Sequence, residues 1–170
     1  MLSYIPLEVK YMIIIEGLDG TGKTTLVNNL EKNNFQLINQ DALFDNSYNR
    51  YINIITNSKP NEVSDRSFIS EMVYGKVLSG KTKLSEKDFF ELIKLYSQYQ
   101  TKIIYLLASK ETLIKRRSND LRDKKVLELF YDELINEFDK RLTQISSYIN
   151  IQIINTAHNN EQQTLIKSLK

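Results

Sequence analysis

The stretch Gly17-Leu18-Asp19-Gly20-Thr21-Gly22-Lys23-Thr24-Thr25 fits the phosphate-binding pattern G-x-x-x-x-G-K-[ST] without a mismatch. The apolar run before it, from Met12 to Glu16, predicts a buried strand, and the residues after it predict a helix. In that setting the glycines let backbone N–H groups surround a polyphosphate, and the helix N-terminus adds partial positive charge. The alternative is a chance glycine-rich turn, which the flanking strand and helix disfavour.

Individual residues of this P-loop have distinct expected roles. Lys23 can reach the β- and γ-phosphates of a bound nucleotide, and we expect it to be surface-exposed in a cleft and needed for catalysis. The hydroxyl of Thr24 can hold Mg²⁺. We expect ATP to be bound by Gly17, Asp19, Gly20, Thr21, Gly22, Lys23, Thr24 and Thr25.

The composition indicates one globular domain over residues 1–170. Hydrophobic residues make up 41% and charged residues 26%, which suits a chain with a sizeable core. A net charge of +2 without a long block of like charges does not suggest a nucleic-acid partner. The absence of cysteine excludes disulfides and fits the cytoplasm, where we expect the protein. No apolar run is long enough for a membrane span, and the start does not resemble a signal peptide.

Strand and helix patterns alternate along the chain. Strands are predicted at 11–16, 35–39, 62–65, 101–107 and 151–154. Helices are predicted at 23–33, around 48–55, at 68–78, from Ser85 through Tyr96, after Ser109, at 126–145 and at 161–169. This alternation predicts an α/β fold, a P-loop NTPase-type parallel sheet of about five strands in the order 2-3-1-4-5 with helices on both faces. Gly17 and Asp65 should converge at the carboxyl ends of the strands, where such sheets bind ligands.

A second informative segment begins at Asp65-Arg66-Ser67, directly after a predicted strand. Asp65 can serve Mg²⁺ or accept a proton from an attacking hydroxyl, and the planar fork of Arg66 suits a phosphate. Ser70 and Tyr74 follow Arg66 by four and eight residues, on one face of the next helix. The plainer alternative is an ordinary helix start, with Asp65 as its cap and Arg66 in a surface salt bridge.

The third segment is the charged run at 115–125 between two predicted helices. A charged run is usually a solvated face, but this one lies where a mobile lid would be useful. Arginines brought over the phosphates stabilise the transferring group and exclude water. The candidates are Arg116, Arg117 and Arg122, which the sequence does not rank.

The order of these motifs resembles the thymidylate kinase family, and more widely the nucleotide and deoxynucleoside kinases. The resemblance implies that Asp19 lies near the acceptor sugar, that Arg66 binds the acceptor phosphate and that Tyr74 lies near the deoxyribose. Some members carry an arginine where this chain has Gly20, so the chain is similar to the branch that supplies arginines from the lid. Relatives are often homodimers, which makes a homodimer possible here.

The chain also departs from that family. The stretch between Asp19 and Asp65 is short, and the usual Arg-Glu-Pro-Gly segment is missing. A remnant of the acceptor site is possible at Phe44, which could stack on a base, and at Arg50, which could reach the base edge or the phosphate. The alternative places Phe44 in the core and Arg50 in solvent. Specificity for thymine is therefore open, as is the choice between nucleoside and nucleotide.

The sequence thus predicts an enzyme that uses ATP and Mg²⁺ to phosphorylate a deoxynucleoside monophosphate, with dTMP the first substrate to test. A phosphate acceptor needs no strong base, whereas a hydroxyl acceptor would use Asp65 or Asp19. That alternative is a deoxynucleoside kinase or a kinase of a hydroxyl on a modified base. A further alternative is a P-loop switch without an acceptor site. A single histidine, His158, and no cysteine exclude a zinc cluster and a hydrolase triad. His158 is expected in the loop after the last strand, which in similar kinases lies beside the adenine of ATP.

Overall fold

The computed structural model describes residues 12–38 and 46–157. They form five strands, at Ile13–Gly17 (β1), Gln36–Leu37 (β2), Glu62–Asp65 (β3), Lys102–Leu107 (β4) and Asn150–Asn155 (β5). The helices are Lys23–Glu31 (α1), Ser47–Thr56 (α2), Phe68–Tyr74 (α3), the π-helical turn Gly75–Ser79 (η1), Glu86–Gln98 (α4), Lys110–Arg116 (α5) and Leu121–Ile145 (α6).

The five strands make one parallel sheet in the order β2-β3-β1-β4-β5, which confirms the predicted topology. Ile15 of β1 is paired with Asp65 of β3, so the P-loop and the Asp65 turn leave the sheet side by side. This register places both predicted segments at the same edge, as expected for ligand binding in parallel sheets.

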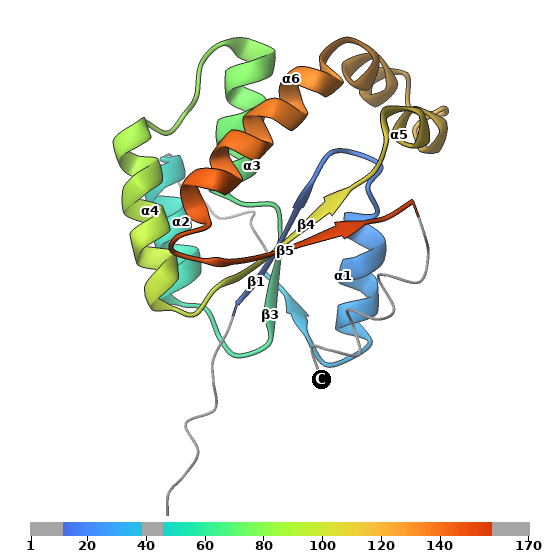
Figure 1. Cartoon of the computed structure of the whole chain (residues 1–170). Coiled ribbons are helices and arrows are strands. Elements are labelled where there is room, and N and C mark those ends of the chain that lie inside the picture. The colour runs from blue at the N-terminus through green and yellow to red at the C-terminus, as the bar shows by residue number, and fades with distance from the viewer. Residues whose placement is uncertain (1–11, 39–45, 158–170) are drawn as a thin grey trace, which may run out of the picture.

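Helices cover both faces of the sheet (Figure 1). Helix α1 lies against one face, and α2, α3, α4 and α6 lie on the other. Alternate residues of β1 supply the two cores, with Ile14 in one and Ile13 and Ile15 in the other. Such two-sided burial explains why the strand reads as a continuous apolar run rather than an alternating one.

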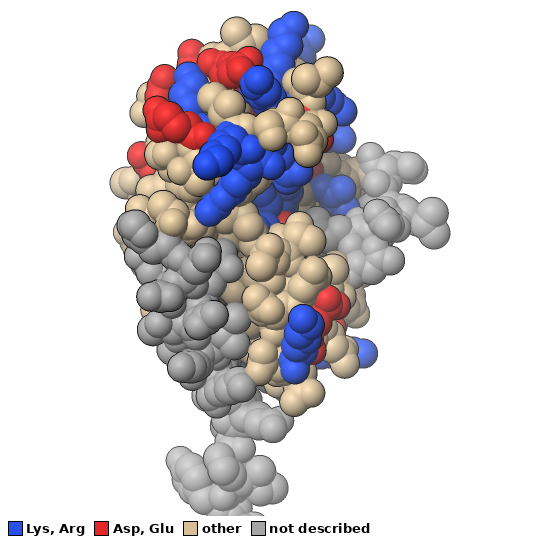
Figure 2. Space-filling view, turned by 90° about the vertical axis from the view of Figure 1, so that its right-hand side faces the viewer, with Lys and Arg blue, Asp and Glu red and all other residues tan. Residues whose placement is uncertain are grey.

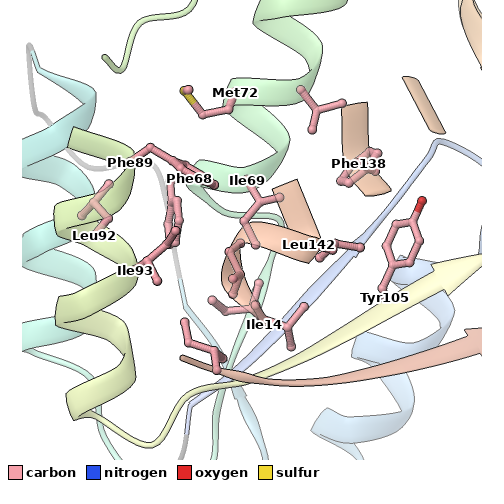
Figure 3. Close-up of a cluster of buried hydrophobic side chains, with 14 of the residues drawn as sticks. Ile14, Phe68, Ile69, Met72, Phe89, Leu92, Ile93, Tyr105, Phe138 and Leu142 are labelled. Atoms are coloured by element: carbon pink, nitrogen blue, oxygen red, sulfur yellow. The ribbon is translucent and has the colours of Figure 1, made fainter. Parts of the chain in front are cut away.

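The larger core joins the site-bearing helix α3 to its neighbours. Figure 3 shows side chains from α3, α4, α6 and the two central strands meeting in this cluster. Phe68 of α3 makes edge-to-face contacts with Phe89, Tyr96 and Tyr51, with ring centroids 5.0–5.8 Å apart. Packing of this kind holds the first turn of α3 rigidly beside the sheet.

Several element boundaries differ from those predicted. Helix α6 begins at Leu121 rather than Val126, because Asp120 accepts a hydrogen bond from the backbone N–H of Asp123 and caps it. The predicted helix 68–78 changes to a π-helical turn at Gly75. Ser85 and Asp88 form a capping box at the start of α4, and the Ser109 side chain caps α5. The predicted helix 161–169 lies outside the described residues.

In the described part of the chain, no helix combines the length and the apolar character needed to cross a membrane.

Candidate active site

The P-loop follows β1 in a conformation that depends on glycine. Gly17 has φ +142°, and a Cβ there would lie 2.5 Å from the carbonyl oxygen of Leu106 on the neighbouring strand. Gly20 has φ +87°, and its missing side chain leaves room for Arg117, whose Cγ would be 3.3 Å from a Cβ at this position. The motif therefore needs glycine here for close approach and for positive φ.

A cleft of about 610 Å³ opens at the carboxyl edge of the sheet, a size suited to a nucleotide-sized ligand. It is lined by Asp19, Gly20, Thr21, Gly22, Lys23, Thr24, Thr25, Asp65, Arg66, Arg116, Arg117 and Thr156. Four of these side chains are cationic and two are carboxylates, so the cleft is built for a strongly anionic ligand. Figure 2 shows Lys and Arg gathered on the face that carries α5 and the start of α6.

Lys23 lines this cleft but is not surface-exposed as we expected, since only 7% of its surface is accessible. Its ammonium donates hydrogen bonds to the carbonyl oxygens of Gly17 and Leu18, both at 2.9 Å. Burial, followed by the positive charge of Arg66, lowers the pKa of Lys23 to about 8. The Lys23 side chain is thus folded back onto its own loop.

The remaining loop residues divide into inward and outward groups. The Thr21 hydroxyl donates to the carbonyl oxygen of Leu18 at 2.8 Å and is buried. Thr24 and Thr25 begin α1 and are exposed to the cleft. The hydroxyl of Thr24 and the carboxylate of Asp65 line the same cleft, and oxygen ligands of this type fit Mg²⁺. Among the described residues, no group of three His, Asp or Glu side chains forms a further metal cluster.

Three predicted acceptor residues meet in one cluster that joins the P-loop to α3. Arg66 Nη2 donates to Asp19 Oδ1, and the Tyr74 hydroxyl donates to Asp19 Oδ2 at 3.2 Å. The Arg66 guanidinium lies over the Tyr74 ring, 5.0 Å from its centroid. Burial raises the pKa of Tyr74 to about 12, so the phenol stays a neutral donor at physiological pH.

Arg66 adopts a left-handed backbone, with φ +74°. This conformation is unfavourable for a residue with a side chain and costs about 1–3 kcal/mol. The backbone N–H of Arg66 donates to the Ile15 carbonyl at 2.9 Å, and its own carbonyl accepts from the Ser64 hydroxyl at 2.7 Å. These bonds hold the turn that aims the guanidinium into the cleft.

Glu16 is a site residue that our sequence analysis missed. Its carboxylate is fully buried at the end of β1 and accepts hydrogen bonds from the hydroxyls of Ser67 and Ser70. Ser70 is therefore buried against Glu16 and does not line the cleft, although we predicted it to bind the acceptor. A carboxylate inside the apolar run Ile13–Glu16 was the signal that could have identified this site.

The three lid arginines occupy different environments. Arg117 lines the cleft beside Gly20, and its Nε lies 3.6 Å from Asp123 Oδ2. Arg116 also lines the cleft and donates to the carbonyl oxygens of Gly20 at 3.1 Å and Thr156 at 2.6 Å. Arg122 is exposed in the first turn of α6 and does not line the cleft.

The predicted lid at 115–125 consists of the end of α5, a short connection and the start of α6. Thr156, which anchors Arg116 from the loop after β5, had no signal in the sequence.

Arg50 lies away from the lining of the cleft, on α2, where it pairs with Glu71 of α3. Its Nη2 donates to Glu71 Oε2 at 2.6 Å and to the Tyr51 hydroxyl at 2.7 Å. Arg50 Nε and Glu71 Oε1 are buried without a hydrogen-bond partner among the described residues. Arg50 is therefore not merely solvated. Phe44 and His158 lie outside the described residues, so their predicted roles stay predictions.

Comparison with solved structures places this architecture among P-loop kinases. The YorR protein from Bacillus subtilis, solved in complex with phosphorylated GDP, superposes with a TM-score of 0.73 at 18% identity over 93% of this chain and 95% of YorR. Deoxyadenosine kinase from M. mycoides, solved with dCMP and dCDP, superposes with a TM-score of 0.61 at 17% identity over 93% of this chain and 97% of that kinase. The same kinase with dATP gives a TM-score of 0.60.

No protein-family model and no curated protein matches the sequence. Identities of this size show the fold and do not distinguish thymidylate kinases from other members of the group. The chain has the fold of P-loop nucleoside and nucleotide kinases.

Proposed function

We propose that the protein transfers the γ-phosphoryl group of ATP to the phosphate of a deoxynucleoside monophosphate, with dTMP as the first acceptor to test. The observation that carries this proposal is the position of Arg66. It lines the same cleft as a complete P-loop, and its guanidinium is bound to Asp19 of that loop. A planar cation in the same cleft as a polyphosphate-binding loop suits a second, acceptor phosphate.

On the donor side, the backbone of the P-loop and Lys23 receive the β- and γ-phosphates. Thr24 and Asp65 would hold Mg²⁺, which neutralises charge on the phosphates when bound. Arg117 is the lid arginine best placed to act on the transferring group, because it lies against Gly20 of the loop. Arg116 is tied to Gly20 and Thr156 and serves to position the donor nucleotide.

On the acceptor side, α3 and its N-cap carry a row of polar side chains that contact β1, the P-loop and α2. Ser67, Ser70, Glu71 and Tyr74 are spaced at three- and four-residue intervals, so they share one face of the helix. Tyr74 would pack against the deoxyribose. Arg50 stays a candidate for contact with the base or the phosphate, and to do so it would have to leave its ion pair with Glu71, which lies outside the cleft lining.

Asp19 is poorly arranged for service as a general base. Both of its carboxylate oxygens already accept hydrogen bonds, one from Arg66 and one from Tyr74. A hydroxyl acceptor needs a base, whereas a phosphate acceptor is already anionic. This arrangement favours a monophosphate. Phosphorylation of a deoxynucleoside is the second candidate, favoured by the likeness to deoxyadenosine kinase.

The test is the initial rate of ADP formation with ATP and Mg²⁺ for dTMP, dUMP, dCMP, dGMP and dAMP, each against its nucleoside. We expect monophosphates to be the better acceptors. Arg66→Ala should lower kcat/KM for the monophosphate by about 10- to 100-fold, the value of one or more charge-assisted hydrogen bonds. Lys87→Ala is the matched control, because it removes an exposed cation far from the cleft lining.

Faster turnover of a nucleoside than of its monophosphate would replace the proposal with the second candidate. ATP binding without turnover of any acceptor would favour the P-loop switch.

A further inference from the structure

Glu16 carries a buried carboxyl group for which the proposed reaction has no direct use. None of its surface is accessible, and it does not line the cleft, so neither nucleotide can touch it. It lies between Ile15 and Gly17, at the junction of β1 and the P-loop. Burying a carboxylate is unfavourable unless its hydrogen bonds are satisfied, so its partners indicate its purpose.

The partners of Glu16 are the first residues of α3. The Ser67 hydroxyl donates to Glu16 Oε1 at 2.6 Å, and the Ser70 hydroxyl donates to Oε2. Ser67 is also the N-cap of α3, accepting from the backbone N–H of Ile69 at 3.1 Å. The Glu16 carboxylate thus accepts two hydrogen bonds from the N-cap and the first turn of α3.

Two consecutive residues of β1 hold two consecutive residues of the turn. The Ile15 carbonyl holds the backbone of Arg66, and the Glu16 side chain holds Ser67. Arg66 has the left-handed backbone described above, a conformation that persists only where the surroundings enforce it. Gly17, the next residue of the same strand, begins the P-loop.

We infer that Glu16 is a positioning residue that fastens the Arg66 turn to the P-loop strand and so sets the Arg66 guanidinium relative to the donor phosphates. This inference rests on the proposed function, because the position of Arg66 affects the reaction only if Arg66 binds the acceptor phosphate. It adds a residue that acts through Arg66 and contacts no substrate.

A purely structural role makes a different prediction about stability. Burial raises the pKa of Glu16, while Ser67, Ser70, Arg66 and Lys23 act in the opposite direction. A raised carboxyl pKa means that the folded state disfavours the ionised form at neutral pH. Glu16→Gln keeps the shape and removes the charge, so it should not lower the melting temperature. A positioning role predicts a functional defect without a loss of stability.

The decisive readout is the reactivity of Arg66 toward p-hydroxyphenylglyoxal, followed by peptide mass spectrometry on the full chain without nucleotide. We expect Arg66 in Glu16→Gln to be modified at least threefold faster than in the wild type. Ser70→Ala removes one of the two hydrogen bonds to Glu16 and should give an intermediate rate of Arg66 modification. The exposed Arg122 is the internal control and should react at one rate in all proteins.

Kinetics provide the second readout. In Glu16→Gln the KM for the acceptor should rise and kcat should fall, with at least a tenfold loss in kcat/KM, while the Kd of an ATP analogue stays within twofold. An unchanged Arg66 rate would overturn the inference, whatever the activity. Faster modification of every arginine together with a lower melting temperature would also overturn it. Failure of the proposed function is distinguishable from failure of this inference, because in that case the wild-type protein itself would turn over no acceptor.

Discussion

Raising the pH through 8 should weaken ATP binding by removing the proton from Lys23. Burial, with the charge of Arg66 as the second cause, lowers the pKa of this lysine from 10.5 to about 8. That change corresponds to about 3 kcal/mol in favour of the neutral amine. About half of the free protein therefore carries the Lys23 proton at pH 8. A bound polyphosphate favours the charged form, so binding at this pH should take up a proton.

The assay is titration calorimetry with a nonhydrolysable ATP analogue and Mg²⁺, in buffers that differ in ionisation enthalpy. We expect uptake of about 0.1 proton at pH 7, about 0.5 at pH 8 and about 0.9 at pH 9. The apparent Kd should rise toward tenfold per pH unit above pH 8 and be nearly level below pH 7.

Lys23→Arg is the matched control, because a guanidinium stays protonated throughout this range. Its binding should show no Lys23-linked uptake and a flat Kd between pH 7 and 9. Wild-type binding with no proton uptake from pH 7 to 9 would refute the reasoning, since Lys23 would then be charged before the nucleotide arrives.

Four substitutions give shorter tests. Arg117→Ala should lower kcat by about 10²-fold or more, whereas Arg116→Ala should mainly raise the KM for ATP; equal effects in steady-state kinetics would contradict these separate roles. Tyr74→Phe keeps the ring under Arg66 and should change kcat/KM for the acceptor by less than about tenfold, as measured by initial rates. Arg141→Met should lower the free energy of unfolding in urea by about 2–3 kcal/mol, because Arg141 is buried and bonded to the carboxylates of α4 and α6. Unchanged unfolding of that last variant would show that the buried guanidinium contributes no net stability.

Local sequence patterns predicted most of the fold because the main signals are short-range. The run from Ile13 to Ile15 is apolar since both faces of the sheet are covered, and glycine at position 17 is required by the adjacent carbonyl of Leu106. The capping box of Ser85 and Asp88 is likewise a local signal, because it involves only four consecutive residues. The start of α6 also has a local signal, the cap at Asp120, but it lies within a charged run whose composition is equally typical of a solvent-exposed connection.

The site was harder to predict, because its geometry depends on contacts between distant segments. Nothing near Lys23 in the sequence indicates that its ammonium turns back to the carbonyls of Gly17 and Leu18. The pairing of Arg50 with Glu71 joins α2 to α3 and appears only once the helices pack. The positive φ of Arg66 is set by β1 and Ser64, since nothing in the identity of the residue favours it. The sequence predicted most of the residues of the site but not which residues they contact.

The pairing of Arg66 with Asp19 bears on the choice of acceptor. In this structure Arg66 is already bound to Asp19, whose other oxygen accepts from Tyr74. An acceptor that uses Arg66 must therefore compete with a carboxylate for the guanidinium. A neutral hydroxyl is too weak an acceptor of hydrogen bonds to do so, whereas a phosphate dianion matches the fork with two oxygens and more charge. Under the proposed function, this pair would therefore select acceptors by charge, and selectivity for a phosphate would reside in Arg66.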